Sequence, residues 1–352
     1  MSDPHAPSTS KPATIVDVSK AAGVAVATVS RVLNNSPLVT KDKSDHVRQI
    51  MEQLNYQPSG RAMKPKPRKI QGETVYHLCL ILRKPYTFRL INARIAVYSE
   101  MIHGVIMRCQ ELGFNLVIKS MAENDSLAKI LPRQRIDGLI FLGDFSDLTD
   151  TREIIRYPAV TVMGNKAPEW GDHVSYDNQA IGRLASDHLI AQGCRHAICC
   201  AIIYPGNTIR TERLSSFELY FRQAGGTSHR CDPAGNEVDS YGSLLAILRD
   251  GVLKALKEAG RPLGLFLAAE EYLSAIQAVL HAERLVIGKD VFIVSCGDAP
   301  TLERNLAPKI ATIDLRSTDI GRRAVDRLFQ RIQSKDESRK VLLLDPTLSV
   351  AE

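Results

Sequence analysis

The chain has 352 residues, of which 45 are Lys or Arg and 39 are Asp or Glu, and this is the length of about two domains plus a smaller module. No apolar run approaches the roughly 18 to 20 residues that a membrane helix needs. The polar first residues lack the apolar core of a secretory signal. We therefore expect a cytoplasmic protein, neither membrane-bound nor exported.

The positive charge is concentrated at the N-terminal end. Residues 1–69 contain 11 Lys and Arg against five Asp and Glu, whereas the rest of the chain holds 34 of each. A basic segment on a neutral body is typical of a nucleic-acid-binding module, because neutralising phosphates releases counterions. A tail that only keeps the chain in solution is the alternative.

The seven cysteines predict neither disulfides nor a metal centre. They lie far apart, form no CxxC pair, and several fall in apolar stretches, as reduced thiols do. Cys194, His188 and His196 could be grouped into a metal site, but their spacing matches no common ligand pattern. No metal is expected.

Residues 13–58 carry the pattern of three short helices around a small core. Thr14 and Asp17 form a variant capping box at the start of the first. Gly23 supplies the positive φ that a tight turn needs. The expected helices are 14–22, 24–34 and a third that begins at Thr40 and ends before Pro58.

In such a helix-turn-helix module the second helix lies in the major groove and its N-terminal residues face the bases. Arg31 is the best base-reading donor there, since its guanidinium can fork onto guanine O6 and N7. Val26 and Ala27 could make apolar contacts, for example with a thymine methyl. A three-helix bundle that merely exposes an arginine is the alternative. Residues suited to phosphate oxygens are Thr14, Thr28, Ser30 and Asn34.

Three N-terminal segments together resemble the LacI/GalR family of bacterial transcriptional regulators. They are TIVDVSKAAGV at 14–24, TVSRVLN at 28–34 and LNYQPS at 54–59. The resemblance implies a homodimer that regulates a promoter, as a repressor, through a palindromic operator in double-stranded DNA.

Two departures from the family pattern bear on mechanism. Ala25 replaces the usual Ser at the start of the recognition helix, so an N-cap worth about 0.5 to 2 kcal/mol is missing. In the hinge segment 59–74, Pro65 falls where the family's hinge helix carries the leucine that enters the minor groove. Because proline stops a helix and Gly60 weakens one, we expect a shorter hinge helix. Met63 is the nearest apolar side chain able to act as a wedge. A disordered basic linker that contacts phosphates is the alternative.

The remaining residues, 75–352, alternate short apolar strands with helical segments, which predicts parallel sheets with helices on both faces. Roughly 270 residues suit two similar lobes, with a ligand in the crevice at the carboxyl ends of the strands. The predicted strands are 78–82, 115–118, 138–142, 159–162, 197–203, 263–268 and 291–295. The predicted helices are 98–112, 178–192, 212–224, 243–259, 270–283 and 317–334.

This gives an organisation of a disordered tail (1–12), a helix-turn-helix domain (13–58), a hinge (59–74) and a two-lobed α/β domain for effector binding and dimerisation (75–352). Within the last part, IDGLI at 136–140 and LAP at 306–308 resemble the periplasmic-binding-protein-like domain of LacI/GalR regulators.

The resemblance also implies effector contacts. Arg213 matches the arginine that grips the effector, and its planar fork suits a sugar diol or a carboxylate. Glu270 stands where the family usually has Asp or Asn. For each candidate the alternative is a surface or helix-capping residue.

Other positions depart from the family. Met163 replaces a customary acid at the first crossover between the lobes, and Asn165 is the candidate substitute. Gly297 occupies the place of another acid, so that Asp298 lies one position beyond it. Tyr98 matches an aromatic residue at the start of the first helix of the body and could stack on a sugar ring.

An α/β enzyme, or a solute-binding protein, with an accessory basic module is the main alternative. The sequence contains no GxGxxG after a strand, no GxxxxGK[ST], no GxSxG and no HExxH, and both alternatives leave residues 13–58 unexplained. We therefore predict a transcriptional regulator rather than an enzyme, without cofactor and without membrane contact. It binds operator DNA under the control of a small-molecule effector, with a carbohydrate favoured.

Overall fold

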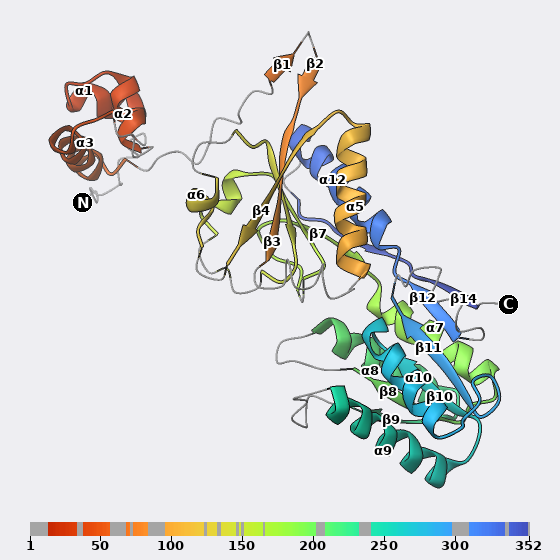
Figure 1. Cartoon of the computed structure of the whole chain (residues 1–352). Coiled ribbons are helices and arrows are strands. Elements are labelled where there is room, and N and C mark those ends of the chain that lie inside the picture. The colour runs from red at the N-terminus through yellow and green to blue at the C-terminus, as the bar shows by residue number, and fades with distance from the viewer. Residues whose placement is uncertain are drawn as a thin grey trace, which may run out of the picture. The chain divides into compact units, whose positions relative to one another are not determined.

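The computed structural model divides the chain into two compact units, Met1–Lys64 and Pro65–Glu352 (Figure 1). It describes residues 13–33, 38–56, 68–70, 73–83, 96–122, 125–131, 135–145, 148, 151–164, 166–201, 208–231, 241–297, 310–334 and 338–350. None of the helices in these ranges is long and apolar enough to cross a lipid bilayer.

The first unit contains the three expected helices, which are α1 (Ile15–Ala21), α2 (Val26–Leu33) and α3 (Lys41–Gln53). Their apolar faces meet in one small core, whose buried members are Val18, Ala22, Val29, Val32, Val47 and Met51. The turn between α1 and α2 uses Gly23 at φ 62°, a conformation that costs glycine little.

The predicted capping box at α1 is confirmed. The backbone N–H of Asp17 donates to the Thr14 hydroxyl oxygen over 3.3 Å, and the Thr14 N–H donates to an Asp17 carboxylate oxygen over 2.8 Å. Hydrogen bonds from the Thr14 hydroxyl and then from the Thr14 N–H to the Asp17 carboxylate hold the pKa of Asp17 below its usual value. Two first-turn amides that would otherwise have no partner are therefore satisfied reciprocally.

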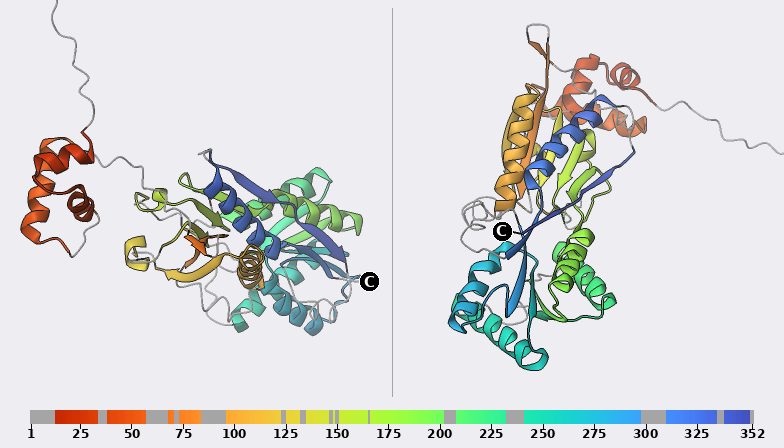
Figure 2. Two further views of the ribbon diagram at one scale, coloured as in Figure 1. Left: turned by 90° about the horizontal axis from the view of Figure 1, so that it is seen from above. Right: turned by 90° about the vertical axis from the view of Figure 1, so that its right-hand side faces the viewer.

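The second unit consists of two α/β lobes. In lobe 1 a six-stranded parallel sheet has the order β13-β7-β6-β5-β3-β4. Its strands are β3 (His77–Arg83), β4 (Asn115–Met121), β5 (Gly138–Leu142), β6 (Ala159–Val162), β7 (Asp172–Tyr176) and β13 (Val341–Leu344). Its helices are α5 (Ala96–Glu111), α6 (Leu127–Ile130), the 3-10 helix η1 (Ile154–Arg156) and α12 (Ser317–Gln333). Figures 1 and 2 show α5 and α12 side by side on one face of this sheet.

Lobe 2 repeats the design with the order β14-β12-β11-β10-β8-β9, in which only β14 is antiparallel to its neighbour. Its strands are β8 (His196–Cys200), β9 (Thr227–Cys231), β10 (Leu263–Leu267), β11 (Val291–Cys296), β12 (Ile310–Asp314) and β14 (Thr347–Val350). Its helices are α7 (Asn178–Ala191), α8 (Thr208–Gln223), α9 (Tyr241–Ala259), the 3-10 helix η3 (Glu270–Tyr272) and α10 (Leu273–Ala282). The predicted pair of parallel α/β lobes is confirmed.

The chain passes between the lobes at three places, from β7 to α7, from β12 to α12 and from β13 to β14. Before lobe 1 it also forms an antiparallel hairpin of β1 (Arg68–Ile70) and β2 (Glu73–Val75). The sequence pattern did not predict this hairpin. The hinge residues that precede it, including Met63, lie outside the described ranges.

His173 on β7 makes the stability of lobe 1 depend on pH. Its side chain is buried, with Nδ1 lying 2.8 Å from the Thr161 hydroxyl, and burial, together with the charge of Arg339, lowers its pKa from 6.5 to about 4. Between these two pH values His173 binds a proton in the unfolded chain but not in the folded chain. The stability that is present above pH 6.5 is therefore lost as the pH falls towards 4. Urea unfolding at several pH values in this range measures the free energy of unfolding. This free energy should fall less steeply with falling pH in His173→Gln than in the unmodified chain. Equal pH dependence in the two proteins would contradict this assignment.

Candidate DNA-binding surface and effector site

Helix α2 presents a polar and small-residue face outside the core of the first unit. Val29 and Val32 are buried, whereas Val26, Ala27 and Arg31 are exposed. Since residues four apart share one side of a helix, Ala27 and Arg31 lie on the same face. Within the described residues the Arg31 guanidinium makes no hydrogen bond or ion pair, so its donors remain available to a base.

The other predicted DNA contacts differ in their surroundings. Thr28 and Ser30 are partly buried on α2. The Thr14 hydroxyl already donates to the Asp17 carboxylate over 2.6 Å, so a phosphate contact from this hydroxyl would have to replace that bond. Asn34 lies outside the described residues.

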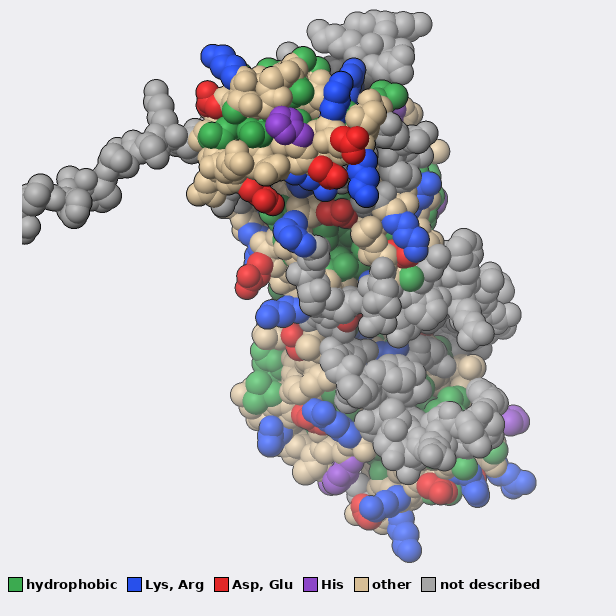
Figure 3. All heavy atoms as spheres, turned by 90° about the vertical axis from the view of Figure 1, so that its left-hand side faces the viewer, with side chains coloured by type: hydrophobic (Ala, Val, Ile, Leu, Met, Phe, Trp, Pro, Cys, Tyr) green, Lys and Arg blue, Asp and Glu red, His purple; other side chains and the backbone are tan. Residues whose placement is uncertain are grey.

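The charge of the first unit is mixed. Residues 13–33 and 38–56 contain five Lys and Arg against four Asp and Glu, while residues 57–69 add five basic side chains and no acid. Figure 3 accordingly shows basic and acidic side chains interspersed on the face it displays. The N-terminal basic surplus therefore comes mostly from the segment that follows the three helices.

Helix α2 lacks an N-cap side chain, as the sequence predicted. The Ala25 carbonyl accepts the first intrahelical bonds, from the N–H groups of Thr28 at 2.8 Å and Val29 at 3.3 Å, but its methyl group cannot accept from the first turn. Ala25→Ser should stabilise the first unit by about 0.5 to 2 kcal/mol because a serine hydroxyl can. Urea unfolding measures the change. Ala27→Ser is the control, since it places the same residue inside the helix, where no stabilisation is expected.

In the second unit, Arg213 of α8 occupies a junction of several elements. The side chain is 4% exposed. Its Nε donates to Asn178 Oδ1 over 2.8 Å, and its Nη1 donates to the Ala268 carbonyl over 2.9 Å and to Cys296 Sγ over 3.5 Å. The guanidinium carbon lies 4.8 Å from the centroid of the Tyr176 ring.

These partners place Arg213 where parallel α/β sheets bind ligands. Tyr176 ends β7, Asn178 begins α7, Ala268 directly follows β10 and Cys296 ends β11. The carboxyl ends of lobe 2 strands and the first crossover between the lobes therefore meet around one guanidinium. Ligands of open α/β sheets bind at this edge.

Glu270, the first residue of η3, is close to the same edge. A Cβ on Gly297 would overlap the Glu270 carboxylate, so the absence of a side chain at position 297 makes room for Glu270. Gly297 directly follows Cys296, an Arg213 partner. Glu270 thus fills the space beside the position at which the family resemblance predicts an acid.

Within the described ranges, none of the remaining effector candidates is found in contact with Arg213. Tyr98 is partly buried on α5 in lobe 1 and packs on the main apolar core. Asn165 and Asp298 lie outside the described ranges. In the part of the chain that the structure describes, no group of three His, Cys, Asp or Glu side chains could hold a metal ion.

Two further residues, one at Arg213 and one in lobe 1, were not among the site candidates predicted from the sequence. Asn178 connects Glu212 to Arg213, because its Nδ2 donates to a Glu212 carboxylate oxygen over 3.3 Å while its Oδ1 accepts from Arg213. Arg83 ends β3 in lobe 1, is 8% exposed, and its guanidinium carbon lies 5.2 Å from the Phe145 ring centroid. A charged residue directly after a buried apolar strand is the signal that could have indicated Arg83.

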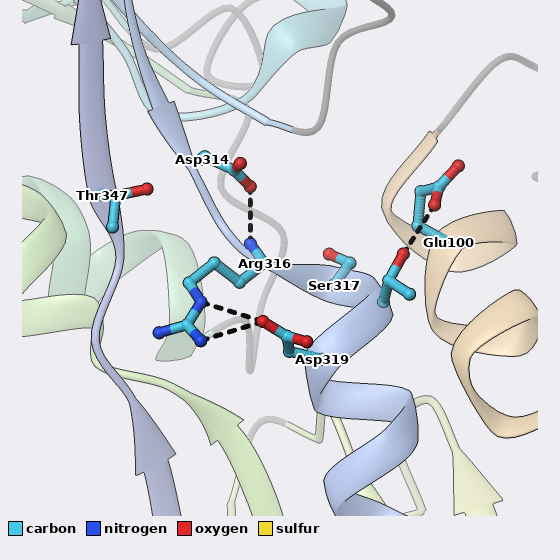
Figure 4. A pocket seen from close by; sticks show the side chains of 7 residues that line it. Glu100, Asp314, Arg316, Ser317, Asp319 and Thr347 are labelled. Carbon is cyan, nitrogen blue, oxygen red and sulfur yellow. Dashed lines mark hydrogen bonds and ion pairs between the residues drawn. The ribbon is translucent and has the colours of Figure 1, made fainter. Parts of the chain in front are cut away.

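A separate cavity of about 400 Å³ lies at the other two crossovers between the lobes. Figure 4 shows Arg316 between Asp314, whose Oδ1 accepts from the Arg316 N–H over 2.7 Å, and Asp319, which it contacts over 2.9 Å. The Thr318 hydroxyl donates to Glu100 over 2.7 Å and so joins α12 to α5. Among the described residues, none of the predicted effector contacts lines this cavity.

Comparison with known proteins identifies both parts of the chain. Residues 14–59 match the model of the lacI family of bacterial regulatory proteins, and residues 186–351 match that of the periplasmic binding protein-like domain. The ribose operon repressor of Haemophilus influenzae is 27% identical over 97% of this chain and 98% of its own length.

Solved structures share the fold. The complex of the transcriptional regulator CelR with cellobiose has a TM-score of 0.60 at 22% identity, and the lac repressor dimer bound to operator and the anti-inducer ONPF has 0.58 at 21%. Each comparison covers 96% of this chain and 98% of the other chain.

A helix-turn-helix unit followed by two parallel α/β lobes defines an effector-controlled transcriptional regulator. The chain belongs to the LacI family of bacterial regulatory proteins and is a DNA-binding repressor with a periplasmic-binding-protein-like effector domain. Members of this family are transcriptional repressors, not enzymes, which excludes the enzyme alternative.

Proposed function

We propose that this repressor acts as a homodimer in the cytoplasm and reads a palindromic operator with helix α2 of each protomer. The observation that carries the proposal is the exposed face of α2. Arg31 extends there with no partner among the described residues, next to the apolar Val26 and Ala27. Such a face can combine a guanine contact with apolar contacts to neighbouring bases.

Effector control is proposed to act through the two lobes. A ligand at the strand ends around Arg213 would contact elements of lobe 2 and the β7–α7 crossover, and would favour one arrangement of the lobes. It can shift that equilibrium only by its different affinity for the two arrangements. Half-sites lie about one helical turn apart, so a small change in the spacing of the paired helical units alters operator affinity.

Some of the similar proteins are named for sugars, and others are purine repressors. The similar Haemophilus influenzae protein is a ribose operon repressor, and the similar solved structure is a complex of CelR with cellobiose. We extend this ligand class to the present chain, since the Arg213 fork, Asn178 and Glu270 supply the donors and acceptors that sugar hydroxyl groups need.

The proposal is tested by selecting a preferred duplex from a random DNA library with the purified chain. Fluorescence anisotropy then compares that duplex with unselected competitor over a range of salt concentrations, because non-specific binding weakens steeply with salt. The selected duplex should contain two related half-sites and retain its advantage. Equal affinity for both duplexes at every salt concentration would reject sequence-specific regulation.

A further inference from the structure

The buried Arg213 has no acidic partner among the described residues. Each of its contacts is to a neutral group, namely the Asn178 amide oxygen, the Ala268 carbonyl, the Cys296 sulfur and the face of Tyr176. The neighbouring carboxylate of Glu212 accepts from the Asn178 amide nitrogen, and within the described ranges no ion pair is formed with Arg213.

Another arginine that is buried to a similar extent does have a carboxylate partner. Arg327 is 6% exposed and donates from Nε to Asp172 Oδ2 over 2.6 Å. Arg213 is 4% exposed and yet lacks such a carboxylate. A buried charge without a counter-ion is costly, so this difference is not expected of a side chain that serves packing alone.

One sequence position beside the site bears on the missing counter-ion. Gly297 directly follows the Arg213 partner Cys296, stands where the family resemblance predicts an acid, and cannot provide a carboxylate. Glu270, which fills the space next to Gly297, forms no hydrogen bond or ion pair with Arg213. The Arg213 guanidinium therefore has no ion-pair partner among the described residues, and a ligand can supply one.

The Arg213 guanidinium is also held in a fixed position before a ligand binds. Three contacts hold Nε and Nη1, and the Tyr176 ring lies against the guanidinium, so little freedom remains to be lost when a ligand arrives. Nη2 makes no hydrogen bond within the described residues. An anionic oxygen at Nη2 would form a charge-assisted hydrogen bond, which is stronger than one to a neutral hydroxyl group.

We propose that the effector carries a phosphate or carboxylate group that pairs with Arg213. This inference rests on the proposed effector control and narrows the ligand class to a sugar phosphate or a sugar acid. The anionic group lies at Arg213, and ligand hydroxyl groups donate to the Glu270 carboxylate at the same strand ends. A neutral sugar would occupy the site without neutralising the guanidinium.

Isothermal titration of the full chain with matched ligands tests the inference. The probes are ribose, ribose 5-phosphate and ribonate, then glucose, glucose 6-phosphate and gluconate, with inorganic phosphate as the minimal anion. At least one anion should bind about tenfold or more tightly than its neutral parent, as expected for a hydrogen bond to a charged group. Preference for the ester or the acid distinguishes phosphate from carboxylate.

The Arg213→Gln variant should lose this preference, and Arg213→Lys should retain part of it. Arg222→Gln, on an exposed residue of the same helix, is the matched control and should bind as the unmodified chain does. A neutral parent that binds as tightly as its anions, a panel in which no anion binds, or an unchanged preference in Arg213→Gln would each overturn the inference.

The ligand comparison in the unmodified chain decides the question even if Arg213→Gln fails to fold. Operator binding is measured on the same preparation. If operator binding responds only to neutral sugars, the anionic effector is wrong and the proposed regulation stands. If no duplex is preferred with or without ligand, the proposed function itself fails.

Discussion

Arg31→Ala is expected to weaken binding to the selected operator by roughly 1 to 3 kcal/mol, which corresponds to about a 5- to 150-fold loss of affinity. Affinity for random duplex DNA should change far less. The reason is that a bidentate contact to guanine distinguishes bases, whereas contacts to phosphate do not. The Arg31 side chain is exposed on α2 and supports no contact within the described unit, so the substitution should leave the fold intact.

Lys43→Ala provides the matched control for Arg31→Ala. Lys43 is exposed in the first turn of α3, and its removal takes away the same unit of charge without touching α2. Loss of a phosphate-directed cation should weaken specific and random DNA binding alike. Fluorescence anisotropy with both duplexes measures both variants. If Arg31→Ala lowers both affinities equally, Arg31 contacts the backbone and base readout by this residue is wrong.

The sequence predicted most of the apolar strands inside the two sheets, although it missed the buried β12. The segments around Leu80, Ile140 and Phe266 are buried on both faces of parallel sheets, and such strands appear as continuous apolar runs. β7 was missed because its sequence, DHVSY, is polar. Its polar side chains are buried only because partners from distant segments satisfy them, and a local pattern cannot reveal that.

The strands β13 and β14 were missed for a different reason. Each lies at one edge of its sheet and contains only exposed and partly buried residues. Short half-exposed strands resemble loops in composition. They also cross from one lobe to the other, and a sequence pattern does not predict in which sheet such a strand pairs.

The sequence predicted the central residue of the effector site but not the side chains and carbonyl groups that surround it. Resemblance to the family singled out Arg213, but its partners Asn178, Ala268 and Cys296 come from three separate segments that meet only in the folded lobe. The absence of a counter-ion within the described ranges is a property of that assembly and could not be predicted from one motif. For Asn34, Met63, Asn165 and Asp298, which lie outside the described residues, the sequence-based roles stay predictions.

Asp172→Asn is expected to lower the free energy of unfolding of the second unit by about 3 to 5 kcal/mol. Asp172 is fully buried at the start of β7. Its carboxylate accepts from Arg327 Nε over 2.6 Å, from Arg331 Nη1 over 2.8 Å and from the Lys340 N–H over 2.9 Å. Asparagine keeps the volume but removes the charge, and it directs an amide N–H₂ towards groups that can only donate.

The matched control for Asp172→Asn is Asp326→Asn on α12, the helix that carries the Asp172 partners Arg327 and Arg331. Asp326 accepts from Arg108 over 2.7 Å, and its side chain is 26% exposed, so its loss should cost no more than about 1 kcal/mol. Chemical unfolding followed by circular dichroism compares the two variants. Equal losses would show that the buried carboxylate does not anchor α12. A larger loss in Asp172→Asn would mean that one carboxylate fastens α12 to both β7 and the segment entering β13.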